Sequence, residues 1–225
     1  MTFQTQFDEP AGLGPRGTLV VLPGRGDSGA LYERFGARIA ADAYRVRIAD
    51  TIDVATAFVN DEDIVHPVVL VGVDTGALQA VQLANGTVDA LVLAGVPVAG
   101  HDVTLDDEVD AKVSCPTTQG RLRDDASLSE RGALTTDHIA ADLQQTTLDV
   151  TIPVLALHGR DDVVSPLDAA RERYAAAKNL QLAVVEQGRH DPLNSLNHRS
   201  VAATVVVFLE TLKSGAKQIT EEVLK

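Results

Sequence analysis

The sequence predicts an α/β fold in which a mostly parallel sheet is doubly wound by helices. Short runs of apolar and β-branched residues alternate along the chain with longer segments of helical character. The runs are apolar throughout, rather than at every second position, which is typical of parallel strands covered on both faces. Strict alternation of strand and helix favours the doubly wound arrangement. The expected strands are 18–22, 45–49, 67–71, 91–94, 154–157 and 180–185.

Helices are expected between these strands because apolar residues recur there at helical spacing. Leu31, Phe35 and Ile39 follow one another every four residues, and a stripe from Val201 to Leu212 has the same period. Such stripes indicate packing against a core and carry no functional information. The expected helices are 30–43, a short one near 54, 77–84, 167–177 and 195–212.

One polar segment, 98–151, interrupts the alternation and contains no strand-like run. We interpret it as a helical cap inserted into a core formed by residues 1–97 and 152–225. A cap in this position would line a substrate pocket, for which His138 and Arg121 are candidates, although polar residues of such a segment more often face solvent.

Composition limits the classes of partner. A length of 225 residues suits one α/β domain with an insertion. The formal net charge of −13 argues against nucleic acid and anionic membranes, which require clustered basic residues. The first residues resemble no signal peptide, and the longest apolar stretch, 90–99, is too short to span a bilayer. We expect a soluble cytoplasmic protein with a small-molecule substrate, in which the single cysteine, Cys115, is a packed residue. Its oligomeric state stays open.

The most informative pentapeptide is Gly72-Val73-Asp74-Thr75-Gly76, which follows an apolar strand and opens a helix. Glycine at both ends lets the backbone turn sharply and lets strand and helix approach closely, as in a nucleophile elbow. The alternative is that Asp74 caps the helix. A cap explains the aspartate but leaves the two glycines unexplained.

Three other segments stand where a catalytic site on this fold would need them. The first is the glycine-rich turn 23–29, whose backbone N–H groups could stabilise a developing anion. The alternative is that this segment is an ordinary strand-to-helix turn. The second, 157–166, places acidic residues at the carboxyl end of a strand, or is a solvated turn. The third, 187–192, presents His190 in a loop, where a histidine is often merely exposed.

Taken together, these segments give the chain order Asp74, Asp162, His190, which is the order of nucleophile, acid and histidine in the α/β-hydrolase triad. The sequence resembles the α/β-hydrolase superfamily over nearly the whole chain apart from the cap. The resemblance implies that Asp74 is the nucleophile, His190 the base and Asp162, three residues after Gly159, the acid. It also implies that the oxyanion or leaving group is stabilised by backbone N–H groups of two further residues, Arg25 and Thr75.

An aspartate at the elbow narrows the resemblance to haloalkane dehalogenases and epoxide hydrolases. Those enzymes displace a leaving group from carbon, form an alkyl ester on the aspartate and hydrolyse it with water activated by the histidine. Attack by Asp74 on an ester would instead give a reactive anhydride, which argues against esterase or lipase activity. The chain departs from both families: it has no tryptophan to hold a halide, and its tyrosines all lie outside the expected cap.

We therefore expect a hydrolase that uses no cofactor and no metal and acts on a small halide or epoxide through an Asp74 alkyl ester. The sequence has no cofactor motif and no histidine spacing typical of metal ligands. The alternative is a non-catalytic protein of the same fold that lost its serine and now binds a ligand or partner. An enzyme should bring Asp74, His190 and Asp162 together around a cavity, whereas a binding protein could bury Asp74 against a cation.

Overall fold

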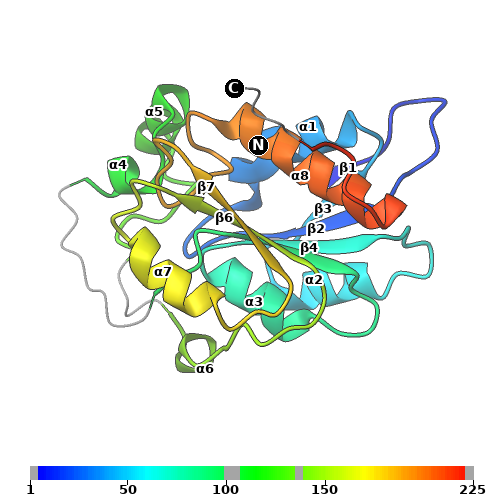
Figure 1. Ribbon diagram of the computed structural model, residues 1–225. Helices are drawn as coiled ribbons and strands as arrows, with labels where there is room; N and C mark the ends of the chain where they lie inside the picture. Colours follow the sequence, from blue (N-terminus) through cyan, green and yellow to red (C-terminus); the bar gives the residue numbers. More distant parts are fainter. Residues whose placement is uncertain (1–4, 99–106, 135–138, 221–225) are drawn as a thin grey trace, which may run out of the picture.

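The computed structural model describes residues 5–98, 107–134 and 139–220, and these form a seven-stranded sheet between two layers of helices (Figure 1). The strand order is β1-β3-β2-β4-β5-β6-β7. β1 runs antiparallel to β3, and every other pair of neighbours is parallel. The strands are β1 (Gln6–Phe7), β2 (Thr18–Leu22), β3 (Arg45–Ile48), β4 (Val68–Val73), β5 (Ala90–Ala94), β6 (Val154–Gly159) and β7 (Leu180–Val185).

The doubly wound, mostly parallel sheet and its six expected strands are confirmed, and the structure adds β1. That strand has two residues and pairs with β3 at Gln6–Arg47 and Phe7–Val46. Two residues are too few to show a period in the sequence, so β1 could not be predicted. The four central strands β2, β4, β5 and β6 are buried at every residue, as their continuous apolar runs indicated.

The helices divide between the two faces of the sheet. α1 and α8 cover one face, while α2, α3 and α7 cover the other (Figure 1). The predicted helix 30–43 begins as a 3-10 turn that Ser28 caps and ends as α1 at Ala40. The helices are η1 (Gly29–Tyr32), α1 (Glu33–Ala40), α2 (Ile52–Val59), α3 (Thr75–Leu83), α4 (Glu108–Lys112), α5 (Pro116–Asp124), α6 (Ala141–Gln144), α7 (Leu167–Tyr174) and α8 (His198–Ser214).

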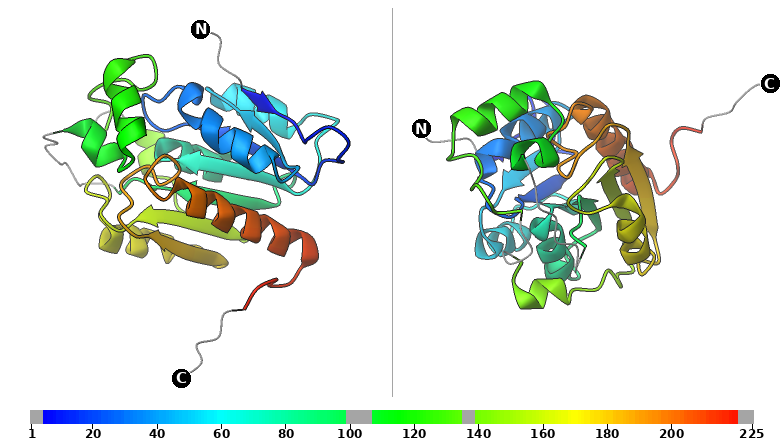
Figure 2. Two further views of the ribbon diagram at one scale, coloured as in Figure 1. Left: turned by 90° about the horizontal axis from the view of Figure 1, so that it is seen from above. Right: turned by 90° about the vertical axis from the view of Figure 1, so that its left-hand side faces the viewer.

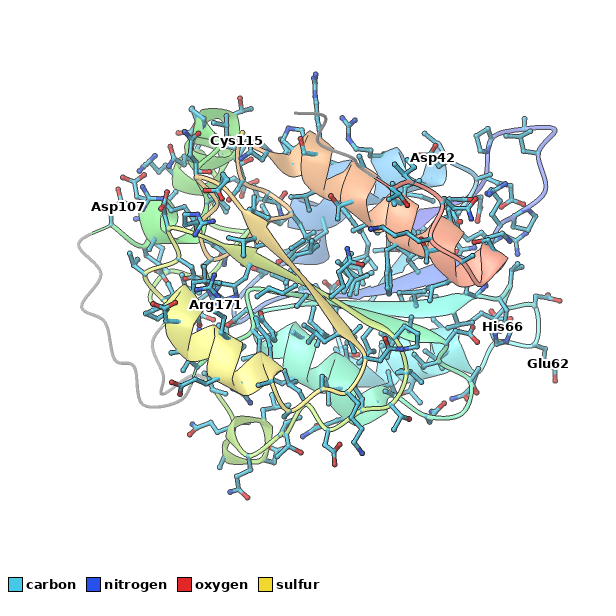
Figure 3. The ribbon with its side chains drawn as sticks, viewed as in Figure 1. Asp42, Glu62, His66, Asp107, Cys115 and Arg171 are labelled. Atoms are coloured by element: carbon cyan, nitrogen blue, oxygen red, sulfur yellow. The ribbon has the colours of Figure 1, made fainter. Side chains whose placement is uncertain are left out.

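The segment expected to form a cap contains three of these helices. α4 and α5 pack against each other beyond the carboxyl ends of the strands, and α6 packs beside α3 (Figure 2). Cys115 directly precedes α5 and is buried, as a packed residue should be (Figure 3). Residues 99–106 and 135–138, which include His138, lie outside the described residues. That 98–151 forms a separate cap stays a prediction.

The sheet brings four loops to one edge. β2, β4, β6 and β7 are parallel, so their carboxyl ends all point to the same side. β2 and β4 are neighbours although β3 lies between them in the chain, so the strand order reverses direction at this point. Such a switch point is where open α/β sheets bind ligands. None of the described helices is both long and apolar enough to cross a membrane.

Candidate active site

Asp74 stands at the turn between β4 and α3 in a strained backbone conformation. Its φ is 51° and its ψ is −122°. Its N–H donates to the carbonyl oxygen of Ala94 at the end of β5 (2.9 Å), and its own carbonyl accepts from the N–H of Ala77 in α3 (3.0 Å). A residue other than glycine adopts a positive φ only where its surroundings impose it, and such residues gather at functional sites. This geometry is that of a nucleophile elbow.

The two glycines of the elbow are there because nothing larger fits. A Cβ at Gly72 would lie 2.3 Å from the carbonyl oxygen of Gly76, and one at Gly76 would lie 2.3 Å from that of Leu22. Strand β4, helix α3 and the end of β2 therefore approach at backbone contact. The capping alternative for Asp74 is wrong, because its side chain makes no hydrogen bond to the helix.

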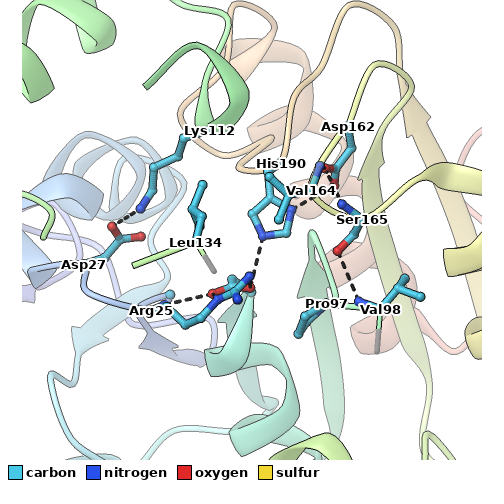
Figure 4. Close-up of polar contacts among 12 residues, drawn as sticks. Arg25, Asp27, Pro97, Val98, Lys112, Leu134, Asp162, Val164, Ser165 and His190 are labelled. Carbon is cyan, nitrogen blue, oxygen red and sulfur yellow. Dashed lines mark hydrogen bonds and ion pairs between the residues drawn. The ribbon is translucent and has the colours of Figure 1, made fainter. Parts of the chain in front are cut away.

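His190 lies between two carboxylates. Its Nε2 is 3.0 Å from Oδ1 of Asp74, and its Nδ1 is 2.9 Å from Oδ2 of Asp162 (Figure 4). The exposed fractions of Asp74, Asp162 and His190 are 2%, 4% and 1%, so the alternative that His190 is merely an exposed loop histidine is wrong. We call these three residues the triad. Loops after β4, β6 and β7 supply them, and Asp161, the neighbouring acid, is exposed instead.

Asp162 is held by its own turn as well as by His190. Its Oδ1 accepts the backbone N–H groups of Val164 (2.9 Å) and Ser165 (2.8 Å). Behind it, His158 lies 2.7 Å from the carbonyl oxygen of Ser165 through Nε2 and 2.9 Å from the Tyr174 hydroxyl through Nδ1. His158 thus supports the turn that carries Asp162.

The side chain of Arg25, in the turn after β2, forms an ion pair with Asp74. Its Nε donates to Oδ2 (2.7 Å) and its Nη2 to Oδ1 (2.9 Å), while its backbone N–H also donates to Oδ2 (2.9 Å). Both side chains are almost fully buried. The sequence suggested a role only for the backbone N–H of Arg25, and the contact of its guanidinium with Asp74 was not predicted. The available signal was a basic residue between two glycines, at the end of the strand next to the elbow.

Four donors fill the acceptor sites of Asp74. A carboxylate offers about four lone-pair positions, and here Arg25 occupies three of them and His190 the fourth. Burial by itself would raise the pKa of Asp74. The hydrogen bond and charge of His190, and then the Arg25 guanidinium, lower that pKa below its ordinary value, so Asp74 is a carboxylate at neutral pH.

His190 is an imidazolium in this state. Burial disfavours its charged form, but the charge and hydrogen bond of Asp162, together with those of Asp74, raise its pKa to about 10. Both ring nitrogens then donate, one to each carboxylate. An imidazolium cannot act as a base, so His190 must lose this proton before it can activate water.

A second buried ion pair lies beside the triad. Asp27, in the same turn as Arg25, pairs with Lys112 of α4 (Figure 4). Asp27 also accepts a hydrogen bond from the Tyr32 hydroxyl (2.8 Å). The N–H of His190 donates to the carbonyl oxygen of Ala111 in α4 (3.3 Å). These contacts fix α4 against the loops of the site. A small apolar cluster borders the triad and consists of Ala111, Leu134 and Val164.

Of the other candidates from the sequence, Arg121 and Thr75 form no described hydrogen bond with the side chains of the triad. Arg121 is exposed on α5, and His138 lies outside the described residues. Thr75 is buried in the first turn of α3, and among the described hydrogen bonds none joins its N–H to Asp74. Within the described ranges, no group of three or more histidine, cysteine or acidic side chains could hold a metal ion.

Comparisons with known proteins identify the class of fold. The chain has the α/β-hydrolase fold, in which an elbow, an acid and a histidine occupy these loops. No protein-family model matches the sequence, and no curated protein sequence is significantly similar to it.

The similar solved structures are far from this chain in sequence. A monoacylglycerol lipase from Paleococcus ferrophilus superposes with a TM-score of 0.72 at 14% identity, covering 94% of this chain and 100% of its own. A monoglyceride lipase from Saccharomyces cerevisiae gives 0.74 at 13% identity, with 92% and 90% covered. MenH from S. aureus gives 0.67 at 13% identity, with 95% and 100% covered. At this distance the similarity establishes the fold, and the site must be interpreted from its own chemistry.

Proposed function

We propose that the protein is a cofactor-free hydrolase that displaces a leaving group from carbon through a covalent Asp74 alkyl ester. One observation carries the proposal: the carboxylate on a strained elbow is hydrogen-bonded to His190, which is hydrogen-bonded to Asp162. That is the spatial relation of nucleophile, base and orienting acid. A small organic halide or epoxide is the substrate class that suits a carboxylate nucleophile.

The first step uses Oδ1 of Asp74, the oxygen that faces His190. Its electron pair forms a bond to carbon, and the bond from carbon to the leaving group breaks with its own pair. Oδ2 keeps its hydrogen bond from the backbone N–H of Arg25, and this N–H is placed as an oxyanion donor would be. Oδ1 must give up a donor in order to attack, and the Nη2 contact from Arg25 is the one that side-chain rotation can release.

The second step requires a neutral His190, and the first step provides the condition for it. An ester at Asp74 carries no charge, so His190 loses one of the two carboxylates that raise its pKa. Neutral His190 then takes a proton from water, which adds to the ester carbonyl. Collapse of the adduct releases the alcohol and restores the Asp74 carboxylate. Asp162 orients His190 and stabilises its charged form.

The second candidate function is binding of a ligand or partner without turnover. The observation that favours it is the complete occupation of the Asp74 acceptor sites by Arg25 and His190. A buried carboxylate paired with a guanidinium is a common structural arrangement, and it leaves no lone pair for attack until Arg25 moves.

Intact mass spectrometry separates the two functions. Wild type and the His190→Gln variant are incubated with a panel of haloalkanes, haloacids and epoxides, and any adduct is located by peptide mapping. His190→Gln should accumulate an alkyl ester on Asp74, because hydrolysis needs the base and alkylation does not. Asp74→Asn is the control that should form none. No adduct across the panel, together with no turnover of simple esters, would favour the binding function.

A further inference from the structure

Lys112 contacts two loops that the proposed hydrolysis step needs. Its backbone carbonyl oxygen accepts the N–H of Asp191 (2.8 Å), and that of the preceding residue, Ala111, accepts the N–H of His190 (3.3 Å). The Nζ of Lys112 pairs with Asp27 in the turn after β2 (Figure 4). One residue of α4 therefore joins the loop after β7, which carries the histidine, to the turn after β2, which carries the oxyanion donor.

Strand pairing does not hold these two loops together. They follow β2 and β7, which are separated by three other strands and lie about 19 Å apart across the sheet. The loops meet above β4, where the N–H of Arg25 and the ring of His190 both contact Asp74. The proposed reaction alters that contact, because Asp74 loses its charge as it becomes an ester. The connection through Lys112 includes no atom of Asp74, so ester formation leaves it in place.

The ion pair in this connection is buried and has further partners on both sides. The side chains of Lys112 and Asp27 are 5% and 1% exposed. The Nζ of Lys112 also donates to the Ser129 hydroxyl (2.9 Å), and Asp27 accepts from the Tyr32 hydroxyl (2.8 Å). A buried polar network in which every member is hydrogen-bonded is rigid. The pair can therefore set the distance between the two loops.

We propose that Lys112 is a positioning residue, which keeps His190 at the correct distance from the Asp74 ester and from the N–H of Arg25. This inference rests on the proposed function. Lys112 acts through the backbone, because the carbonyl oxygens of α4 hold the histidine loop and the ion pair with Asp27 holds α4. Ester formation depends little on this support, since the Asp74 carboxylate itself then holds His190. Ester hydrolysis depends on it strongly, because that contact is weakened when water must be placed.

The test compares the two steps in Lys112→Met, which keeps most of the apolar stem and removes the charge. Time-resolved intact mass, with a haloalkane or epoxide that alkylates wild type, gives the rates of ester formation and ester loss. We expect ester loss to slow about 100-fold, as a misplacement of about 1 Å can cause, while ester formation changes much less. Lys112→Met/Asp27→Asn also removes the stranded charge, so it should fold even if the single variant does not, with the same selective slowing. Leu209→Ala truncates a buried residue of α8 and should lower stability without changing the ratio of the two rates.

Hydrogen exchange measured by NMR gives a second readout that requires no substrate. The exchange rate of the Asp191 amide is divided by that of Val92 in β5, whose amide reports global unfolding. This ratio should rise at least about tenfold in Lys112→Met/Asp27→Asn and stay unchanged in Leu209→Ala. Equal slowing of both steps, or an unchanged exchange ratio when Lys112 is replaced, overturns the inference. Failure of the proposed function looks different: no variant would form an ester, while the Asp191 amide would still exchange faster without Lys112.

Discussion

Asp74 and Asp162 flank the same imidazole at nearly the same distance, yet they are held in different ways. The second oxygen of Asp162 accepts two backbone N–H groups from its own turn. Asp74 is held chiefly by the side chain of Arg25, which comes from another loop and has rotatable bonds. One carboxylate is therefore fixed by the backbone, and the other by a partner that can leave. Under the proposed function, this difference suits Asp162 to orienting His190 and Asp74 to reacting with substrate.

The largest expected effect separates these roles. Asp74→Asn should abolish adduct formation, whereas Asp162→Asn should still form the ester but hydrolyse it about 10³–10⁴-fold more slowly, because His190 loses the acid that orients it. Time-resolved intact mass measures both steps. Asp161→Asn changes the exposed neighbouring acid and should behave as wild type. An adduct in Asp74→Asn, or equal damage from Asp161→Asn, would contradict the assignment.

Removing the movable partner should lower stability. Arg25→Ala leaves Asp74 buried without its guanidinium, and we expect the free energy of unfolding to fall by about 3–5 kcal/mol in urea denaturation. Arg25→Ala/Asp74→Ala removes the stranded charge as well and should recover part of the loss. If the single variant lies within about 1 kcal/mol of wild type, the pair contributes little to the fold.

Alkaline pH should lower the stability of the protein, because His190, which lies between the two carboxylates, loses its charge. The pKa of His190 is raised from 6.5 to about 10 in the folded protein, so its contribution is complete below pH 6.5 and is lost as pH rises through about 10. Between pH 7 and pH 9 the folded state binds close to one more proton than the unfolded state, so the free energy of unfolding falls by about 2–3 kcal/mol. Urea denaturation of His190→Gln over the same range should lack this part of the slope.

The smallest effect belongs to an exposed ion pair near the same turn. Arg160 donates to Glu186 across the ends of β6 and β7, and both side chains are largely exposed. Glu186→Gln should change the free energy of unfolding by about 0.5 kcal/mol or less. A loss as large as that of Arg25→Ala would show that burial does not distinguish the two pairs.

Much of the architecture could be predicted because short-range patterns in the sequence determine it. Continuous apolar runs placed the central strands β2, β4, β5 and β6, and the glycines at 72 and 76 placed the elbow. The boundaries were less certain: the final helix was expected from 195 but begins at His198, after the side chain of Ser195 bonds back to the carbonyl oxygen of Asp191 (2.8 Å). Such side-chain competition leaves little trace in a hydrophobic period.

The partners of the site could not be predicted from local patterns. Arg25 and Asp74 are separated by 49 residues, and Lys112 and Asp27 by 85. The sequence around each of these residues does not indicate its partner, because the pairing depends on the strand order and on where α4 packs. Thr75 and Arg121 were candidates for the same reason, since their chemistry was suitable but their positions were unknown.

By itself, the sequence determined the doubly wound fold, the carboxylate at the elbow and the chain order of Asp74, Asp162 and His190, because periodicity, glycine placement and residue type are local properties. Only the tertiary structure decided that Arg25 forms an ion pair with the Asp74 carboxylate and that His190 lies between two acids. Those facts arise from burial, which brings distant charges together and lets each set the protonation state of the next.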